Sequence, residues 1–423
     1  MQKVVIIGNG ISGVTAAIEL RKRTDASITI ISDEHPYFFS RTALMYVYMG
    51  HMKKAHLKPY ADEFWKKNRI ELLSDRVTGI DVDNRILSLG HSGTISYDTL
   101  ILAVGSEPNK FGWPGQDLDR VTGLYHMRDL DRLEQWSEEI RQGVIVGGGL
   151  IGIELAEMLL SRGKEVTFLV REDSFWNMVL PPEESSMINR HILEHGIDLR
   201  LNTELKEIKD DGNGRVSGVI TSKGELIDCQ MVGLTAGVHP NIQWLKETPL
   251  EIHRGILVDE YLRTNLPDIY AIGDCAQMKH PRPGRRPIEA VWYTGKMMGE
   301  TVAQTIGGNA TEYDPGIWFN SAKFLDIEYQ VYGYVPVQLG ENEASLYWEH
   351  PKGKSSVRII YERSTDRVLG FNLMGIRFRH KICEGWIAKG TRIQQVLSSL
   401  TDAFFDPEFY ATYEQDILSC FSK

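Results

Sequence analysis

The sequence KVVIIGNGISGVTAAIEL, residues 3–20, decides the fold of the first part of the chain. Residues 4–7 form an apolar run that is too short for a helix and typical of a buried parallel strand. The turn GNGISG follows at residues 8–13, and apolar residues then recur at helical spacing. A second strand is predicted at residues 28–31. Strand, tight turn, helix and strand in this order predict a Rossmann-like nucleotide-binding unit.

Each glycine of this turn has its own physical reason. Gly8 permits the turn, Gly10 lets a pyrophosphate approach the backbone, and Gly13 lets the helix pack closely on the strand. Ile11 and Ser12 begin the helix, and the free backbone N–H groups at this helix N-terminus favour phosphate.

An acidic residue is expected at the end of the second strand, where it would meet the ribose hydroxyls of an adenosine. Asp33 lies 20 residues after Gly13, and Glu34 follows it. The pattern leaves open which of the two side chains turns inward.

The chain repeats the whole pattern. Residues 144–146 are predicted as the strand, GGGLIG at residues 147–152 as the turn, residues 153–160 as the helix and residues 166–170 as the second strand. One such motif is weak evidence, but two complete copies predict two dinucleotides. We expect FAD at one and a nicotinamide dinucleotide at the other, with hydride passing between them. The nicotinamide site is predicted at Gly147, Gly149, Leu150, Ile151 and Gly152.

Opposite charges follow the second strand of this second copy. Arg171 suits the 2′-phosphate of NADPH, whereas Glu172 suits the ribose hydroxyls of NADH. The choice between NADH and NADPH stays open. It leans towards NADH, because Arg171 competes with three nearby acids, Glu165, Glu172 and Asp173.

Length and composition set the outer limits. A chain of 423 residues predicts two or three domains, and a net charge of −10 argues against nucleic acid as a partner. No apolar run reaches membrane-spanning length, and no signal-peptide pattern precedes the first strand. We expect a cytoplasmic protein without a metal site. The four cysteines are far apart in sequence and are interpreted as reduced thiols: Cys229, Cys275, Cys383 and Cys420.

Further segments resemble the FAD-dependent pyridine nucleotide-disulfide oxidoreductase family, roughly over residues 1–310. TLILAVGSEP at residues 99–108 resembles the crossing from the first domain to the second, and VGLTAGVHPN at residues 232–241 resembles the return crossing. NLPDIYAIGDCA at residues 265–276 resembles the motif whose aspartate, here Asp274, holds the flavin ribityl chain. IEAVWYTGKMMGETVA at residues 288–303 resembles the following helix, whose N-terminus faces the flavin. The resemblance extends the FAD site to Val77, Ala103, Gly105, Gly273, Glu289, Ala290 and Val291, and the NAD(P) site to Gly237.

The resemblance implies an α/β fold with two Rossmann-like dinucleotide-binding domains and a C-terminal α+β domain. Residues 1–110 and 240–310 are predicted to form a discontinuous FAD-binding domain, and residues 111–239 the NAD(P)-binding domain inserted in it. Residues 311–423 are predicted to form the C-terminal α+β interface domain, with strands at residues 357–361 and 368–373 and helices from Ile382 and Ile393. Gly212, Asn213 and Gly214 predict a hairpin turn.

The cysteine chemistry of many members of this family is missing. Where the single-cysteine branch carries its thiol, this chain has Ala43, and no cysteine precedes Cys229. Where the disulfide reductases carry a C-terminal histidine, this chain has Asp406. Without a thiolate there is no disulfide exchange. We therefore expect electrons to pass directly from flavin to an acceptor.

This leaves the branch that resembles ferredoxin and rubredoxin reductases, the flavoprotein part of nitrite reductases, and apoptosis-inducing factor. PYFFSRTAL at residues 36–44 resembles a loop of that branch and implies that Arg41 contacts an FAD phosphate, the alternative being a solvated loop charge. Those reductases carry a lysine that pairs with the glutamate of the second glycine motif, whereas here Met45 follows the leucine. Glu154 and Trp292 are the candidate catalytic neighbours of the flavin, with a solvated glutamate and a core tryptophan as the alternatives.

KHPRPGRRP at residues 279–287 is a basic run in an acidic chain. It is interpreted as a solvated loop or as a docking patch, with Arg282, Arg285 and Arg286, for an acidic electron carrier. We expect an FAD-dependent NAD(P)H oxidoreductase that passes electrons to a small ferredoxin- or rubredoxin-like protein. The alternatives are an NADH oxidase that uses a small oxidant directly, and an NAD(H)-sensing flavoprotein that does not turn over. Monomer and homodimer both stay open.

Overall fold

The computed structural model describes residues 1–421, which form two compact units by their internal contacts. The first unit comprises Met1–Asn109, Tyr125–Asp131 and Val238–Pro315. The second comprises Lys110–Leu124, Arg132–Gly237 and the chain from Gly316 onward. Helix α4 (Met127–Trp136) runs from one unit into the other.

A five-stranded parallel sheet forms the centre of the first unit, in the order β19-β7-β1-β2-β3. Its strands are nearly continuous apolar runs, as expected for a parallel sheet that is covered on both faces. The strands are β1 (Lys3–Ile7), β2 (Ser27–Ser32), β3 (Ile70–Ser74), β7 (Thr99–Leu102) and β19 (Ile269–Ala271).

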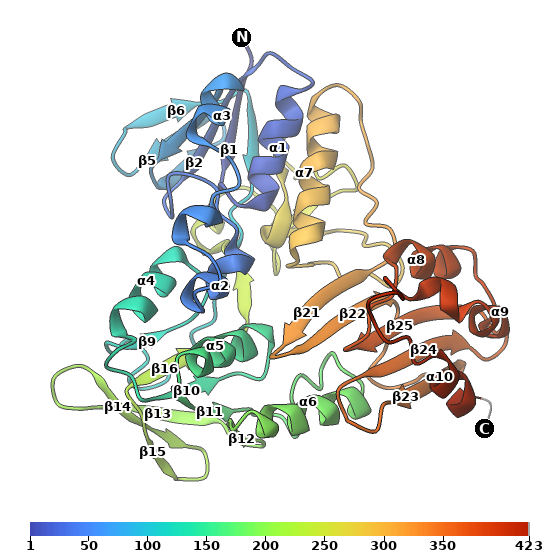
Figure 1. The fold of residues 1–423 in the computed structure, drawn as a ribbon. Coiled ribbons are helices and arrows are strands. Elements are labelled where there is room, and N and C mark those ends of the chain that lie inside the picture. Colours follow the sequence, from blue (N-terminus) through green and yellow to red (C-terminus); the bar gives the residue numbers. More distant parts are fainter. Residues whose placement is uncertain (422–423) are drawn as a thin grey trace. The chain divides into compact units, whose positions relative to one another are not determined.

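Two long helices lie side by side against this sheet, α1 (Ile11–Arg21) and α7 (Trp292–Ile306) (Figure 1). They approach closely because α7 presents glycine to α1. A Cβ on Gly299 would lie 2.6 Å from the backbone oxygen of Ser12. The shorter helices of the unit are α2 (Leu44–Tyr48) and α3 (Asp62–Lys67).

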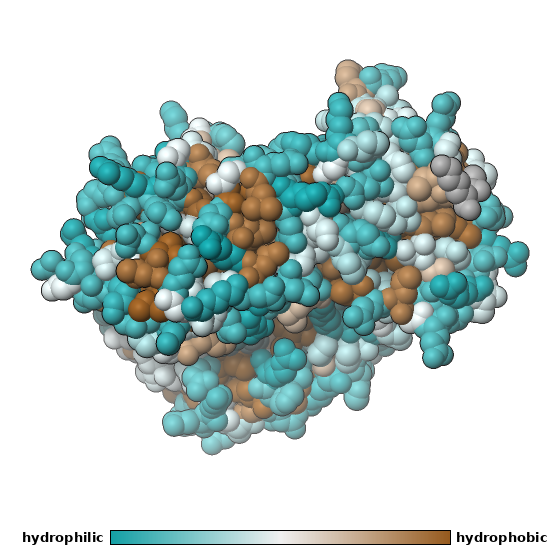
Figure 2. Space-filling model, turned by 90° about the horizontal axis from the view of Figure 1, so that it is seen from below, coloured by the Kyte–Doolittle hydropathy of each residue, from teal (hydrophilic) through white to brown (hydrophobic). Residues whose placement is uncertain are grey.

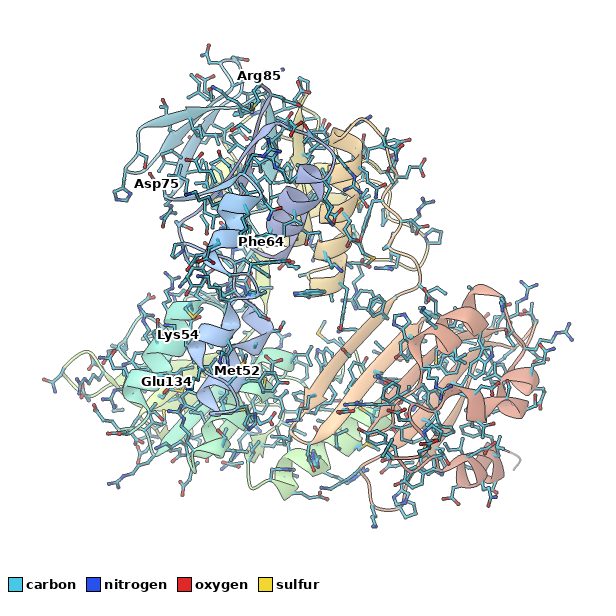
Figure 3. The ribbon with its side chains drawn as sticks, turned by 45° about the horizontal axis from the view of Figure 1, so that its top comes forward. Met52, Lys54, Phe64, Asp75, Arg85 and Glu134 are labelled. Carbon is cyan, nitrogen blue, oxygen red and sulfur yellow. The ribbon has the colours of Figure 1, made fainter. Side chains whose placement is uncertain are left out.

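Smaller sheets complete the first unit. An antiparallel sheet of β4 (Val77–Asp81), β5 (Ile86–Leu89) and β6 (Thr94–Ser96) stands between β3 and β7 in sequence. Arg85, labelled in Figure 3, lies in its first turn and pairs with Asp268 at 2.8 Å, directly before β19. Two further pairs are β8 (Ser106–Pro108) with β17 (Val238–Pro240), and β18 (Ile256–Val258) with β20 (Ala276–Met278).

The second unit contains another five-stranded parallel sheet, in the order β12-β11-β10-β16-β9. Its helices are α5 (Leu150–Ser161) and α6 (Pro182–Glu194). An antiparallel sheet of β13 (Leu205–Asp210), β14 (Val216–Thr221) and β15 (Leu226–Asp228) stands between β12 and β16 in sequence. The parallel strands are β9 (Val121–Thr122), β10 (Gln142–Val146), β11 (Glu165–Leu169), β12 (Asp198–Arg200) and β16 (Met231–Leu234).

The two parallel sheets have the same design. In each, the strand before the glycine turn is central, with the next strand on one side and a later return strand on the other. In each, the chain forms a three-stranded antiparallel sheet between the third strand and the return strand in sequence, that is, between β3 and β7 and between β12 and β16. The predicted α/β fold with a duplicated nucleotide-binding topology is confirmed. The hairpin turn predicted at Gly212 to Gly214 is also confirmed, since it joins β13 to β14.

The rest of the second unit is an antiparallel sheet with helices on it, in the order β21-β22-β25-β24-β23. Helices α8, α9 and α10 lie beside this sheet (Figure 1), and their apolar residues share one core with it. The strands are β21 (Phe319–Phe324), β22 (Ile327–Gly333), β23 (Glu343–Glu349), β24 (Ser356–Glu362) and β25 (Val368–Met374). The helices are α8 (His380–Ala388), α9 (Ile393–Ser398) and α10 (Glu414–Phe421).

The surface is largely hydrophilic in the view of Figure 2, with separate hydrophobic patches. Among the helices of residues 1–421, none combines the length and the apolar character that crossing a bilayer requires.

We expect the third glycine of the second turn to be required for stability and the second glycine not to be. A Cβ on Gly152 would lie 2.4 Å from the backbone oxygen of Gly147, whereas a Cβ on Gly149 would meet nothing within 4 Å. Gly152→Ala should therefore lower the free energy of unfolding by roughly 1–3 kcal/mol, the usual cost of overpacking. Gly149→Ala is the matched control and should change it by no more than about 0.5 kcal/mol.

The measurement is thermal or urea unfolding followed by circular dichroism, without added nicotinamide nucleotide. Equal stability of the two variants would contradict this account of the turn.

Candidate functional site

The first glycine turn connects β1 to α1 at the carboxyl end of the central strand. Gly8 has φ +110°, in the region that favours glycine, and a Cβ there would lie 2.1 Å from the backbone oxygen of Ala103. A Cβ on Gly13 would lie 2.1 Å from the backbone oxygen of Gly8. Gly10 differs, because a Cβ there would meet nothing within 4 Å. The fold therefore requires Gly8 and Gly13, whereas the space at Gly10 is left for something other than protein.

The second glycine turn, between β10 and α5, has the same three features. Gly147 has φ +117°, and a Cβ there would lie 2.6 Å from the backbone oxygen of Thr235. Gly152 is closed off by backbone, as already described. The middle glycine, Gly149, again faces open space. Two turns with one packing pattern indicate two ligands of one chemical kind.

The helices that follow these turns begin without a side-chain cap. Gly10 and Gly149 are the N-cap residues of α1 and α5, and neither helix has an acidic residue in its first turn. Their first backbone N–H groups, which include those of Ile11, Ser12, Leu150 and Ile151, have no partner within the helix. An uncapped N-terminus beside an open glycine is a site for phosphate.

Of the two acids after β2, Glu34 turns inward and Asp33 does not. The side chain of Asp33 is 60% exposed and lies 3.9 Å from Arg76, whereas that of Glu34 is 19% exposed. Against its burial, hydrogen bonds from His126 and Arg41 lower the pKa of Glu34 to about 2. Glu34 therefore carries a permanent charge at the end of β2.

Arg41 is held in place from two sides. Its guanidinium makes two hydrogen bonds to Glu34, at 2.6 and 3.1 Å, and lies over the ring of Tyr125 at 4.3 Å from the ring centre. Its NH1 group also contacts the backbone oxygen of Tyr125. The alternative of a freely solvated loop charge is wrong, because the arginine is fixed in this network. Its predicted contact with an FAD phosphate stays a prediction.

A second polar cluster links the segment after β7, the return strand of the first sheet, to the predicted flavin motif. Ser106 follows β7 and donates a hydrogen bond from its hydroxyl to Asp274 at 3.0 Å. Its backbone N–H donates to the hydroxyl of Tyr125 at 3.2 Å. Burial raises the pKa of Asp274. Gly273 and Asp274 begin a 3-10 turn directly after β19.

The remaining predicted FAD residues lie in the same unit. Ala103 is buried directly after β7, and Gly105 follows with φ +67°. Val77 is the buried first residue of β4. Sequence reasoning missed Ser106, Tyr125 and His126, because the last two lie in a stretch without a motif and all three meet the site only through the fold.

The predicted helix after the flavin motif begins later than expected. Helix α7 starts at Trp292 with Val291 as its N-cap, so Glu289 and Ala290 precede the helix instead of opening it. Glu289 is buried and accepts two hydrogen bonds from Arg285, at 2.5 and 2.7 Å. This ion pair holds the chain extended just before α7. Trp292 is 39% exposed, so the alternative of a core tryptophan is wrong.

The basic run before α7 is less basic than its sequence indicates. Arg285 is not a surface charge, since its side chain is only 6% exposed and is paired with Glu289. This corrects its assignment to a docking patch. Arg282 is exposed but lies 3.2 Å from Glu312, and Lys279 pairs with Glu251 at 2.6 Å. Arg286 is exposed, and its side chain has no ion-pair partner within residues 1–421.

Glu154 lies on the first turns of α5, next to the second glycine turn. It is half-buried, and within the described chain it makes no hydrogen bond or ion pair. Burial, and then the charge of Glu157, raise the pKa of Glu154 to about 7. Glu157 itself pairs with Lys323 at 2.6 Å. The predicted loss of a lysine partner for Glu154 agrees with this environment, and Glu154 can exist in either protonation state near neutral pH.

The residues that predict the nucleotide preference contact each other. Arg171 and Glu172 follow β11, and their side chains pair at 2.8 Å. The Arg171 side chain is 66% exposed and the Glu172 side chain 25%. Gly237, after β16, has φ +82°. The predicted contacts of Arg171 and Glu172 with the nucleotide stay predictions.

The cysteines are not placed for thiol chemistry. Cys229, Cys275 and Cys383 are buried, and only Cys420 is exposed. Burial raises the pKa of Cys275, the cysteine beside Asp274, to about 12. Its sulfur donates to the backbone oxygens of Leu102 and Ile272. It is therefore a neutral thiol that packs in the core.

Comparison with known proteins agrees with this geometry. The pyridine nucleotide-disulphide oxidoreductase family matches residues 2–304. The chain is 31% identical over 326 residues to rhodocoxin reductase of Rhodococcus erythropolis, covering 76% of each chain. It is 28% identical over 396 residues to an NADH oxidase of Methanocaldococcus jannaschii, covering 88% of this chain and 87% of the other.

Among solved structures, the ferredoxin reductase for the CYP199A2 system of Rhodopseudomonas palustris superposes with a TM-score of 0.81 at 27% identity. The match covers 89% of this chain and 91% of that one.

The site fits the cofactors of these proteins. The open space at Gly10 and the uncapped start of α1 suit the pyrophosphate of FAD, and Gly149 with α5 suits that of a nicotinamide dinucleotide. With the family matched over most of its length, the chain belongs to the pyridine nucleotide-disulphide oxidoreductase family and is an oxidoreductase that uses FAD together with NADH or NADPH.

Proposed function

We propose that the chain transfers electrons from NAD(P)H, by way of FAD, to a small electron-carrier protein of the ferredoxin or rubredoxin kind. The observation that carries this proposal is the state of the cysteines. The thiol in the first unit, Cys275, is buried and neutral, and Ala43 stands where a flavin-side thiol is expected. Electrons therefore need an acceptor outside the chain. The similarity to rhodocoxin reductase supports a carrier protein as that acceptor.

We assign FAD to residues 1–110 and 240–310, and the nicotinamide dinucleotide to residues 111–239. Bound FAD accepts a hydride from the reduced nicotinamide and releases electrons to an acceptor. The protein itself positions the two cofactors and places charged groups beside them. In this proposal Glu34, which Arg41 holds in place, accepts hydrogen bonds from ribose hydroxyls, and Asp274, which already accepts one from Ser106, accepts another from the ribityl chain.

The N-terminus of α7 suits the negative charge of a reduced flavin. Val291 is an N-cap without a side-chain hydrogen bond, and the first turn of α7 contains no acid. The positive end of this helix dipole stabilises negative charge. We propose Trp292 and Glu154 as neighbours of the flavin, with Glu154 able to gain or lose a proton near neutral pH.

The first test of this proposal is the electron stoichiometry. Anaerobic titration with NADH or dithionite should reduce the flavin fully with two electrons per FAD, because no thiolate pair can take up two more. The absorbance of the oxidised flavin measures the end point. An end point at four electrons would contradict the proposal, as would activity on a low-molecular-weight disulfide that an alkylating reagent abolishes.

The second prediction concerns the nucleotide. Arg171→Ala should weaken NADPH binding more than NADH binding, and Glu172→Ala should do the reverse, because only NADPH offers a phosphate at this point. One charge-assisted contact is worth about 1.5–3 kcal/mol, or roughly ten- to a hundredfold in affinity. The KM for each nucleotide in flavin reduction measures the effect. Equal effects on NADH and NADPH would show that neither side chain reaches the ribose.

The third prediction concerns carrier docking. Arg286→Glu reverses an exposed cation that has no ion-pair partner among the described residues, so it should slow association with an acidic ferredoxin at low salt and leave hydride transfer from NADH unchanged. Lys206→Glu is the matched control, because it makes the same charge change at an exposed lysine of the second unit. Arg285→Glu is not a suitable test, since it would break a buried ion pair.

Stopped-flow absorbance separates flavin reduction from carrier reduction. If Arg286→Glu and Lys206→Glu slow the carrier equally, the effect comes from net charge and the loop is not a docking patch.

An oxidase is the second candidate, because the NADH oxidase of Methanocaldococcus jannaschii matches the chain over most of its length. The two functions differ in what reoxidises the reduced flavin. Rapid NADH consumption in air without any carrier favours the oxidase, and its dependence on an added carrier favours the reductase.

A further inference from the structure

Two histidines and an aspartate meet in the second unit, at a place that plays no part in the proposed electron transfer. His191 lies on α6 and His195 at its C-terminal end, one helical turn apart. Asp326 lies in the two-residue turn between β21 and β22. One ligand atom from each of the three lies within 4.8 Å of the others.

His191 is buried, with 1% of its side chain exposed, and is aimed at this cluster. Its Nε2 atom lies against Oδ1 of Asp326, yet neither ring nitrogen has a hydrogen-bond partner of acceptable geometry among residues 1–421. Leaving a polar group buried in this way costs free energy, and such a group needs a partner. The carboxylate of Asp326 is the group that faces this ring.

A hydrogen bond to the backbone shows that Nδ1 of His195 carries a proton. Nδ1 of His195 lies 2.9 Å from the backbone oxygen of His191. A carbonyl oxygen can only accept a hydrogen bond, so Nδ1 carries a proton, and in the neutral imidazole Nε2 then has the lone pair. That Nε2 faces Oδ1 of Asp326 at 3.4 Å. Two ligands on one tetrahedral ion, each about 2.0–2.1 Å from it, are separated by about 3.3 Å.

An outer carboxylate completes the arrangement. Nδ1 of His191 lies 3.7 Å from an oxygen of Glu194, so a second carboxylate stands on the side of the ring away from Asp326, just beyond hydrogen-bond distance. Histidines that bind metals usually donate their second N–H to a carbonyl or carboxylate, which orients the ring. Lys354 lies 3.4 Å from Oδ2 of Asp326 and leaves Oδ1 to the histidines.

We infer that His191, His195 and Asp326 form a binding site for one divalent transition-metal ion of the Zn²⁺ class. Two imidazoles and one carboxylate suit Zn²⁺ and its neighbours, and water supplies the remaining position. The ion would enter between His191 and Asp326, which requires the carboxylate to swing away from the ring. The Asp326 side chain is 57% exposed and has room to do so.

Such an ion would act as a structural brace. Helix α6 is already held to β24 by Arg358, which makes hydrogen bonds to Glu184 at 2.8 and 2.9 Å and to Glu183 at 2.6 Å. Glu183 and Glu184 lie in the first turn of α6, whereas the histidines lie at its other end. The metal would therefore hold the second end of the helix to the turn between β21 and β22. No redox or hydrolytic step is implied.

The test is equilibrium dialysis and calorimetry with Zn²⁺ alone, on flavin-loaded protein treated with a chelator. Wild type should bind one Zn²⁺ per chain at this site. His195→Gln and Asp326→Asn should each weaken binding at least about tenfold. Both side chains are partly exposed, so these variants should fold, and NADH reduction of their flavin checks that they do. His253→Gln, an exposed histidine of the first unit, is the control and should bind as wild type does.

Thermal unfolding gives a second reading of the same site. At a Zn²⁺ concentration about one hundredfold above Kd, Tm of wild type should rise by about 3 °C, and that of Asp326→Asn should not rise. Equal Zn²⁺ binding by all four proteins would overturn the proposal. So would an Asp326→Asn variant whose Tm is lowered by the same amount with and without Zn²⁺, since that result identifies a plain His191–Asp326 ion pair.

Discussion

The structure depends on two places where a helix touches the backbone of the glycine turn directly before it. At Gly13 and at Gly152 even a single methyl group would lie within 2.4 Å of a backbone oxygen. This contact brings the uncapped end of α1 or α5 to the carboxyl edge of its sheet. The middle glycines, Gly10 and Gly149, keep that edge open. The open edges that suit phosphate are therefore a consequence of how tightly each helix packs on its glycine turn.

Much of the fold could be predicted because these contacts are local in sequence. The glycine turns, their strands and the hairpin at Gly212 to Gly214 each follow from a few neighbouring residues. The start of α7 could not be predicted, because it depends on the buried pair of Arg285 and Glu289. The same pair removes Arg285 from the surface, where the sequence alone had placed it. Whether a charged side chain lies on the surface or in the core can be predicted only when its ion-pair partner is known.

The candidate site likewise combines features that local sequence predicts with features that depend on residues distant in sequence. The sequence left Asp33 and Glu34 as equals, and the fold separates them, because Arg41 and His126 reach only Glu34. Ser106 donates a hydrogen bond to Asp274 from another segment of the chain, and Tyr125, in a stretch without a motif, meets Ser106. The His191 and His195 spacing is visible in the sequence, but Asp326 joins them from more than a hundred residues away. Long-range partners are what sequence patterns do not contain.

The central claim is that electrons leave the reduced flavin for a carrier protein and not for a thiol. The most direct measurement is the reoxidation of NADH-reduced protein, followed at the flavin absorbance by stopped flow. Acidic ferredoxin or rubredoxin, air-saturated buffer and a low-molecular-weight disulfide are compared as oxidants. We predict that a carrier reoxidises the flavin fastest and that the disulfide does not reoxidise it. Reoxidation by the disulfide, faster reoxidation by air than by any carrier, or a reduced protein that is stable in air and towards every carrier would contradict this claim.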